Sequence, residues 1–534
     1  PMFLDPCYME LFSKLTVILA YLPEDRKETI INWLSKLGSA DSLKTIVQIF
    51  QQYITINSLN MENIKELHCS IEALDLVSQA NDIGRIISHT EFYNDAVNNP
   101  EMDLKIHYKV WLDIHHLRAQ GELINSARLI DENLFSFCNY SWIMDPSTKS
   151  YILDIDSAFS MNQSVRETMV SHAFFNPFSV NDLSPYLVLR IHREKIVEDT
   201  LNQLILDPKV LKKPLKVEFV GEQGIDEGGV KKEFFQLIVK ELFDPKYGMF
   251  DFFEDIRVFY FNGHSFESKL KFELIGCILG LAIYNRVILD VHFPMVVYRK
   301  LAGFPVDLED LKGVNPDMYR SFEKLLTYTG DVENDFCFTF QVVREVFGEI
   351  KTYELKPNGD QIPVTADNRE EFVKLYTEWY LNDVCDEVFQ AFHKGFHNVA
   401  GGKAFQLFKP EELEQLVCGE RELDFHELEK ATEYEDGYTK DSDIVKYFWE
   451  IVYEYSEEQK RALLAFATGS DRSPIGGLRN LEFFILRHGE DSDRLPTAHT
   501  CFNYLLIPEY SSKEKLKERL TLAINNSQGF GLLQ

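Results

Sequence analysis

Hydrophobic residues recur at helical spacing through the first third of the chain. Ile64, Leu67 and Ile71 lie three or four residues apart in a charged background, which is the period of one face of an α-helix. Pro23, followed by two acidic residues, is typical of the start of another helix. Residues 1–165 are therefore predicted to form an α-helical scaffold or partner-binding region.

The pattern becomes mixed in the middle of the chain. Apolar runs predict strands at 186–191 and 215–220, and a helix at 194–204 is expected between them. A glycine-rich loop, 221–229, leads into a further helix at 230–242. This loop is not expected to bind a nucleotide, because it lacks the Gly-Lys-Ser/Thr ending and its carboxylates would repel phosphate.

The hydrophobic patterns of helices and of strands both continue toward the C-terminus. Helices are predicted at 443–455 and 457–466, and the short apolar run 504–507 is predicted to be a buried strand. The last helix is expected to begin at a capping box formed by Ser511 and Glu514. The fold class that these patterns predict is α+β and mostly helical, with an all-α N-terminal region.

The composition excludes several classes of function. The 534 residues carry 85 acidic and 55 basic side chains, a net charge of −30, whereas sequence-independent nucleic-acid binding needs a basic surface. No apolar stretch reaches the roughly 18 residues that a membrane span needs. The 8 cysteines have no zinc-ligand spacing and are too few for a disulfide scaffold. No metal or other cofactor is therefore predicted, and a reducing compartment is expected.

Cys501 is the strongest candidate for chemistry. It lies between Pro496 and the predicted strand 504–507, where a side chain can be exposed and still be held in place. A thiol reacts as its thiolate, and a neighbouring imidazole such as that of His499 can increase the thiolate fraction. Taken alone, an inert packing cysteine would be the commoner interpretation.

The residues around Cys501 favour the reactive interpretation. Residues 495–503, Leu-Pro-Thr-Ala-His-Thr-Cys-Phe-Asn, closely resemble the catalytic end of HECT-type ubiquitin ligases, with the nearest match in the E6-associated protein subfamily. The resemblance extends over roughly residues 185–533. Further blocks that follow the order of the family lie at 215–230, 279–285, 290–294 and 468–478.

This resemblance implies a bilobal HECT catalytic domain. The first lobe, which binds a ubiquitin-conjugating enzyme, is expected at 166–419 and the second, with the catalytic cysteine, at 420–534, with a hinge near Gly419. Cys501 would accept ubiquitin as a thioester and transfer it to lysines of substrate proteins. Proteasomal degradation, with the proteasome as a further partner, and a cytoplasmic and nuclear location are expected. No cofactor is implied, since ATP is used upstream by the activating enzyme.

Residues near the thiol receive roles from the same resemblance. His499 could tune the thiol or donate to the developing oxyanion, or it could only hold the loop, and the same alternatives stand for Thr500. Phe530 is expected to assist transfer. Members of the family usually carry this phenylalanine four residues from the end, whereas here Gln534 places it five from the end.

Transfer to a lysine also requires removal of a proton, because the ordinary pKa of lysine is about 10.4. A carboxylate near Cys501 could act as the base or could orient the amine. Glu222, Glu233 and Asp290 are the candidates for this acidic assistance, although a solvated surface or helix-end charge is the commoner interpretation of each.

A groove for the conjugating enzyme is predicted from an aromatic and apolar set. Several of its members follow helical spacing, and all match the groove of the family by position, although an ordinary core would show the same period. The candidates are Met318, Phe322, Leu325, Tyr328, Phe336 and Phe372.

Two other functions are compatible with the sequence. Cys501 could pair with His397 or His426 in a cysteine hydrolase, or it could be incidental to an α-rich scaffold. The chain opens with Pro1 and is expected to be a fragment. The E6-associated subfamily usually carries a small zinc-binding module near its N-terminus, and no cysteine cluster for one exists here, so zinc dependence is not predicted.

Overall fold

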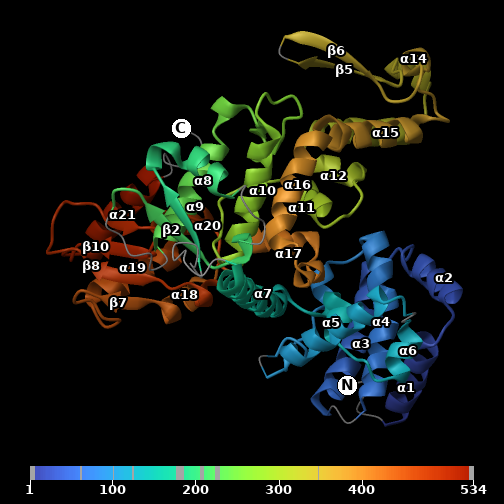
Figure 1. The fold of residues 1–534 in the computed structure, drawn as a ribbon, viewed down its shortest axis with the longest axis horizontal. Helices are drawn as coiled ribbons and strands as arrows, with labels where there is room; N and C mark the ends of the chain where they lie inside the picture. Colours follow the sequence, from blue (N-terminus) through green and yellow to red (C-terminus); the bar gives the residue numbers. More distant parts are fainter. Residues whose placement is uncertain are drawn as a thin grey trace. The chain divides into compact units, whose positions relative to one another are not determined.

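The computed structural model describes residues 6–60, 63–99, 101–122, 125–175, 186–204, 210–222, 229–346 and 348–527. The chain divides into two compact units (Figure 1). The first comprises Pro1–Asp156 with Lys403–Phe408, and the second comprises Ser157–Gly402 with Lys409–Gln534. Helices dominate both units and short strands occur only in the second among the described residues, which confirms the mostly helical α+β prediction.

The first unit is built around one central helix, α4 (Ile64–Gly84). Leu67, Ile71 and Leu74 of α4 are completely buried, as their helical spacing predicts. The helices that pack on α4 or follow it are α1 (Pro6–Ala20), α2 (Glu24–Leu34), α3 (Ala40–Asn60), α5 (Leu104–Ala119), α6 (Ser126–Asp131) and α7 (Pro146–Phe175). Across the described residues, no helix combines the length and apolar character needed to cross a membrane.

Within the second unit, residues 186–402 and 409–419 are defined here as the central part. Strand β1 (Leu187–Ile191) pairs in parallel with β2 (Leu215–Phe219), and the crossover between them contains α8 (Ile196–Leu204). Helix α9 (Gly229–Leu242) follows β2. These elements agree with the predicted strands and helices to within two residues.

Two helices of the central part, α10 (Lys269–Tyr284) and α16 (Asp386–Ala400), lie side by side (Figure 1). Glycines permit this close packing: a Cβ atom on Gly276 would lie 2.0 Å from the Phe392 carbonyl oxygen. The remaining elements are β3 (Phe250–Phe253), β4 (Val258–Phe261), α11 (Met295–Leu301), α12 (Leu308–Lys312), α13 (Pro316–Thr327), α14 (Val332–Phe336), β5 (Gln341–Val346), β6 (Glu349–Glu354), α15 (Arg369–Leu381) and α17 (Pro410–Cys418).

The C-terminal part, residues 420–527, has a sheet with the strand order β7-β8-β10-β9. Strand β10 pairs in parallel with β8 and antiparallel with β9. The elements are α18 (Phe425–Ala431), β7 (Glu433–Glu435), α19 (Asp443–Glu454), α20 (Glu457–Thr468), β8 (Phe484–Arg487), β9 (Thr497–His499), β10 (Tyr504–Ile507) and α21 (Lys513–Ser527).

The C-terminal part also has its own apolar core. The strand predicted at 504–507 is confirmed as β10. The predicted capping box of Ser511 and Glu514 is wrong by one residue, because α21 begins at Lys513 and Ser512 Oγ accepts from the Lys515 backbone N–H at 3.2 Å. Two adjacent serines made both caps compatible with the sequence.

Candidate active site

Cys501 lies in the tight turn that joins β9 to β10. The turn is closed by the Phe502 N–H, which donates to the His499 carbonyl oxygen at 3.1 Å, and by the Asn503 N–H, which donates to the Thr500 carbonyl oxygen at 3.4 Å. Asn503 has a φ of 55°, a left-handed conformation that asparagine tolerates better than most residues. The sheet therefore presents the thiol at the tip of a hairpin, 497–507, which sequence analysis described only as a loop before a strand.

Helix α9 of the central part holds this hairpin. Lys232 Nζ donates to the Thr500 carbonyl oxygen at 2.7 Å and to Asn503 Oδ1 at 2.6 Å. The other end of the Asn503 amide, Nδ2, donates to the Glu482 carbonyl oxygen at 2.8 Å. Both sides of the turn are thus anchored, one by the C-terminal part itself and one by α9.

The Cys501 thiol is free and half-buried. Burial is the main reason that its pKa is raised above the usual value, and the Glu233 carboxylate raises it further. Lys232, a hydrogen bond from Thr500 and Arg193 act in the opposite direction without cancelling the rise. The resting thiol is consequently protonated at neutral pH, and it must lose a proton before it can attack.

A single arginine joins two of the three predicted acidic residues. Arg193 Nη1 donates to Glu233 Oε1 at 2.7 Å, and Arg193 Nη2 donates to Glu222 Oε2 at 3.0 Å. Its guanidinium stacks over the Phe219 ring, 4.0 Å from the centroid, and lowers the pKa of Glu222. The structure therefore brings Glu233 to the thiol and Glu222 to the same cluster.

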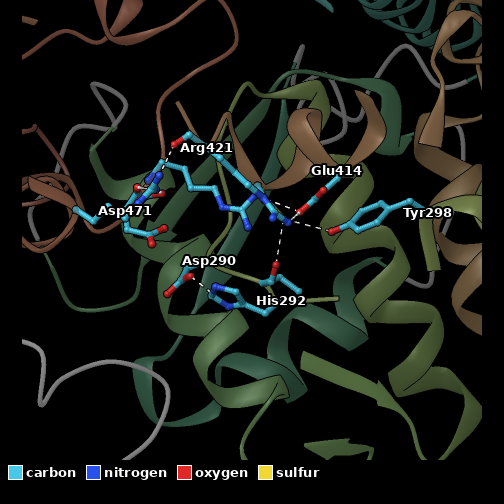
Figure 2. A network of polar contacts seen from close by, with 11 residues as sticks. Asp290, His292, Tyr298, Glu414, Arg421 and Asp471 are labelled. Carbon is cyan, nitrogen blue, oxygen red and sulfur yellow. Dashed lines mark hydrogen bonds and ion pairs between the residues drawn. The ribbon is translucent and has the colours of Figure 1, made fainter. Parts of the chain in front are cut away.

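The third acidic candidate, Asp290, lies elsewhere. It lines a cleft of about 1050 Å³ between the central and C-terminal parts, which Thr500 also lines. Its partner is His292, whose Nδ1 lies 3.6 Å from Asp290 Oδ1 (Figure 2). Asp290 remains partly exposed, but desolvation by the cleft walls raises its pKa. Asp290 is thus connected with the catalytic hairpin through the cleft that Thr500 also lines, and not through a contact with the thiol.

The linker between the two parts is fixed by polar contacts. Glu414 of α17 accepts from Arg421 Nη2 at 2.6 Å and from Arg472 Nη1 at 3.2 Å, within the cluster drawn in Figure 2. The Glu420 N–H donates to the Ser473 carbonyl oxygen at 2.8 Å. Gly419 has a φ of +81°, and a Cβ atom there would lie 2.4 Å from that oxygen. Only glycine fits this linker position in the observed arrangement.

The predicted groove residues form one aromatic cluster with two layers. Phe322, Leu325 and Phe372 are buried and form its base, so Leu325 in particular is not available to a partner. Sequence periodicity could not separate the base from the surface. The residues that reach the surface are Met318, Tyr328, Phe336 and Phe338. Phe338, which was not predicted, is 42% exposed and stacks on Phe372 with the ring centroids 5.9 Å apart.

The remaining candidates divide into exposed, undescribed and unsupported residues. His499 is exposed at the end of β9, and within the described ranges its imidazole makes no hydrogen bond. Phe530 and Gln534 lie outside the described residues. The hydrolase pairing gains no support, because His397 Nε2 contacts the Leu301 carbonyl oxygen at 3.1 Å and His426 stacks on a tyrosine ring, whereas the groups that shift the pKa of Cys501 are Glu233, Lys232, Thr500 and Arg193. No group of three metal-ligating side chains occurs in the part of the chain that the structure describes.

Two neighbours of the thiol, Lys232 and Arg193, were missed by sequence reasoning. Lys232 is 268 residues from Thr500 in the sequence, and its contact crosses from one part of the unit to the other. In the sequence, Lys232 is distinguished only by its position beside the acidic candidate Glu233. Arg193 lies just after the end of β1, and its guanidinium lies over Phe219 at the end of the paired strand β2. The parallel pairing of these two predicted strands could therefore have pointed to Arg193.

Comparison with known proteins identifies the class of this protein. Residues 236–533 match the family model described as HECT-domain (ubiquitin-transferase). The probable E3 ubiquitin-protein ligase HECTD2 of Mus musculus is 37% identical over 98% of this chain and 68% of its own length. The HECTD2 protein of Homo sapiens is 36% identical over 100% of this chain and 69% of its own length. The chain therefore belongs to the HECT family and is a HECT-type ubiquitin transferase.

A further relative places the chain more finely. The probable E3 ubiquitin-protein ligase HERC4 of Homo sapiens is 38% identical over 94% of this chain, which spans 48% of the HERC4 length. The predicted placement nearest to the E6-associated protein subfamily is wrong, because the relatives aligned over nearly the whole chain are named HECTD2 and HERC4. The short catalytic blocks that carried that placement do not discriminate among members of the family.

Proposed function

We propose that this protein is a ubiquitin-protein ligase that carries ubiquitin as a thioester on Cys501. The observation that supports this most directly is the free, half-buried thiol at the tip of the 497–507 hairpin, inside the segment that matches the HECT family. A hairpin tip gives a large acyl donor access to the sulfur, and hydrogen bonds on both sides keep the sulfur in place.

The first step is a transfer between two thiols. The Cys501 thiolate attacks the carbonyl carbon of the donor thioester, a new C–S bond forms, and the conjugating enzyme leaves as a thiolate that takes up a proton. Because the pKa of Cys501 is raised, the free thiolate is scarce at neutral pH and its formation must be coupled to the arrival of the donor.

The second step transfers ubiquitin to a lysine of the substrate protein. The neutral amine attacks the thioester carbonyl, the C–N bond forms, the C–S bond breaks, and the surplus proton of the amine ends on the departing sulfur. Glu233, the carboxylate whose charge raises the pKa of the thiol, is assigned the role of receiving or orienting the ammonium, with Arg193 holding it in place. Glu222 and Asp290 would attract the substrate lysine, His499 would donate to the oxyanion, and Phe530 would assist transfer.

The surfaces for partners follow from the two parts of the second unit. We take 166–419 as the lobe that binds the conjugating enzyme and 420–534 as the catalytic lobe, with residues 1–165 as a scaffold for substrates or other partners. Met318, Tyr328 and Phe336 supply the half-buried apolar side chains that such a groove needs. Proteasomal degradation of substrates and a cytoplasmic and nuclear location belong to this proposal.

A charging assay tests the proposed function. The chain is mixed with activating enzyme, a panel of conjugating enzymes, ATP and labelled ubiquitin, and the products are separated with and without reductant. A ubiquitin adduct that disappears with reductant and is absent in Cys501→Ala is expected. An adduct that persists in Cys501→Ala, or no adduct with any conjugating enzyme, would contradict the proposal.

The acidic residues are tested in a second assay, in which the preformed adduct is chased with free lysine. Glu233→Ala is expected to charge normally and to discharge more slowly than wild type, because the carboxylate acts only on the incoming amine. Equal discharge rates would assign Glu233 to the structure of the cluster alone.

A further inference from the structure

Lys232 is the residue that connects the central part to the catalytic hairpin. It projects from the first turn of α9, and its ammonium donates to two acceptors that flank the thiol, the Thr500 carbonyl oxygen at 2.7 Å and Asn503 Oδ1 at 2.6 Å. Hydrogen bonds in which one partner is charged are among the stronger ones in proteins. The two acceptors are three residues apart, so the contact fixes the turn and not only one point of it.

The shape of the contact supports the same docking. A Cβ atom on Gly229, at the start of α9, would lie 2.5 Å from Phe502 Cζ, so the aromatic ring of the turn rests directly on the glycine backbone. Gly469 similarly faces Gln236 of α9 and the Thr500 side chain. The hairpin therefore fits α9 through an aromatic ring, a glycine surface and one ammonium group.

The charged groups that face the thiol come from two elements. Lys232 and Glu233 belong to α9, and Arg193 approaches from the segment after β1, where it is held by Glu222 and Glu233. Burial lowers the pKa of Lys232 to about 8. A desolvated ammonium with two acceptors is costly to retain without a role in holding the hairpin.

We propose that Lys232 is a positioning residue that fastens the Cys501 hairpin to α9, and that this docked state is the one in which ubiquitin is passed to the acceptor lysine. The second half of this statement rests on the proposed function, because it assumes a thioester on Cys501. In the docked state the sulfur faces Glu233 and Arg193, which suit an incoming ammonium and a departing thiolate. The aromatic cluster assigned to the conjugating enzyme is not part of this contact, so charging is not expected to depend on Lys232.

The fastening role is tested without ubiquitin, by alkylation of Cys501 with iodoacetamide between pH 6 and 9.5. Every variant carries Cys7→Ser and Cys337→Ser, because these two cysteines are also exposed. Lys232→Met removes the donor, so the hairpin is released, the sulfur loses its burial, and alkylation becomes faster with a lower apparent pKa. Lys232→Arg retains a donor and is expected to restore the protection.

The outcomes of this experiment separate two physical roles. A slower reaction with a higher apparent pKa in Lys232→Met would mean that the ammonium only attracts the thiolate, and an unchanged profile would mean that it does neither; both overturn the proposal. Lys240→Met is the matched control, since Lys240 is an exposed lysine on the same helix and should leave the profile unchanged.

The link to transfer is tested with the charging and chase assays. Lys232→Met is expected to charge at a rate within about twofold of wild type and to discharge to free lysine about tenfold more slowly, because it loses both hydrogen bonds of the charged group to the hairpin. Equal losses in both steps would overturn the assignment of the docked state to discharge. A complete absence of charging in wild type would contradict the proposed function instead, while the alkylation profiles would still decide whether Lys232 fastens the hairpin.

Discussion

The interior of the C-terminal part and its contact with the central part are built from different interactions. The interior is apolar, because Phe448, Ile485 and Leu505 are at most 1% exposed. The same is true of Leu516, Leu520 and Ile524 of α21. The contact is mainly polar and includes the Lys232 hydrogen bonds and the Glu414 ion pairs. The Phe502 ring adds a large apolar group.

This difference separates what must stay folded from what can move. Apolar burial stabilises the interior by about 25 cal/mol per Å² removed from water, and it cannot be given up during a reaction cycle. Polar contacts between parts of a chain can be exchanged for water with little net change in free energy, which permits relative motion. A catalytic thiol that must meet a donor and later an acceptor needs a rigid support and a releasable contact, and the C-terminal part has both.

The largest effect is expected inside the core. Leu520→Ala removes a completely buried side chain of α21 and should lower the free energy of unfolding by about 2–5 kcal/mol. Leu522→Ala is the matched control, because Leu522 lies on the same helix and is 43% exposed. Chemical denaturation followed by circular dichroism measures both. Similar losses in the two variants would mean that α21 does not divide into a core face and a solvent face.

The next effect is expected at the docking contact. Gly229→Leu places a side chain where the Phe502 ring lies and should disfavour docking by about 1–3 kcal/mol, the usual cost of overpacking. Stability to denaturant should hardly change, in contrast to Leu520→Ala. The readout is the protection of Cys501 from iodoacetamide, which Gly229→Leu should reduce.

A second substitution controls for other effects of the new leucine. Phe502→Ala removes the ring and makes room for the added side chain, so the double variant should recover part of the protection that Gly229→Leu loses. If the double variant behaves as the sum of the two single changes, then the glycine and the ring act independently and the shape argument for docking is wrong.

The ion pairs at the linker should contribute less, and they should contribute unequally. Glu414 and Arg472 have side chains that are 13% and 12% exposed, whereas Arg421 is 69% exposed. A double-mutant cycle between Glu414→Gln and Arg472→Gln should give a coupling energy of about 1–2 kcal/mol, and the cycle with Arg421→Gln should give less than about 1 kcal/mol. Cys501 protection at fixed pH again measures docking, and equal coupling energies would show that burial does not rank these pairs.

The parts of this picture that the sequence predicts are local. The run 504–507 is a strand and Leu516, Leu520 and Ile524 share one buried face, because apolar period and length determine such elements. Cys501 is identified as the catalytic residue by the resemblance of the nine consecutive residues 495–503 to the family. Its chemistry depends on neighbours that are distant in sequence, and no local pattern predicts that Lys232 meets Thr500.

Other residues were misplaced because local patterns do not report surroundings. Helical spacing identified Leu325 but could not show that it lies under the aromatic cluster and not on its surface. Asp290 lies in one of the blocks that resemble the family, yet its neighbour is His292 and not the thiol. The burial and the contacts of a residue depend on how helices and strands pack together. Local patterns in a single sequence do not show this packing.

The smallest effect concerns the protonation of Lys232. Its pKa of about 8 in the docked state lies below the ordinary value of about 10.4 that an undocked lysine would have. The docked state therefore binds fewer protons between these two values, and docking becomes more favourable as the pH rises from about 8 toward about 10.4. Cys501, with its raised pKa, acts in the opposite direction over the same range, so the lysine contribution is best seen in Cys501→Ala.

Lysine side-chain NMR measures this directly. In the Cys501→Ala variant, the Lys232 signal should titrate near pH 8, and this signal is assigned by its absence from the double variant Cys501→Ala, Lys232→Arg. When Gly229→Leu is added to Cys501→Ala and the hairpin undocks, the pKa of Lys232 should return toward the ordinary value. A Lys232 that titrates near 10.4 in both backgrounds would mean that the contact remains hydrated. The distinction between a dry interior and a polar contact would then be sharper still, because the contact would involve even less loss of water than its geometry indicates.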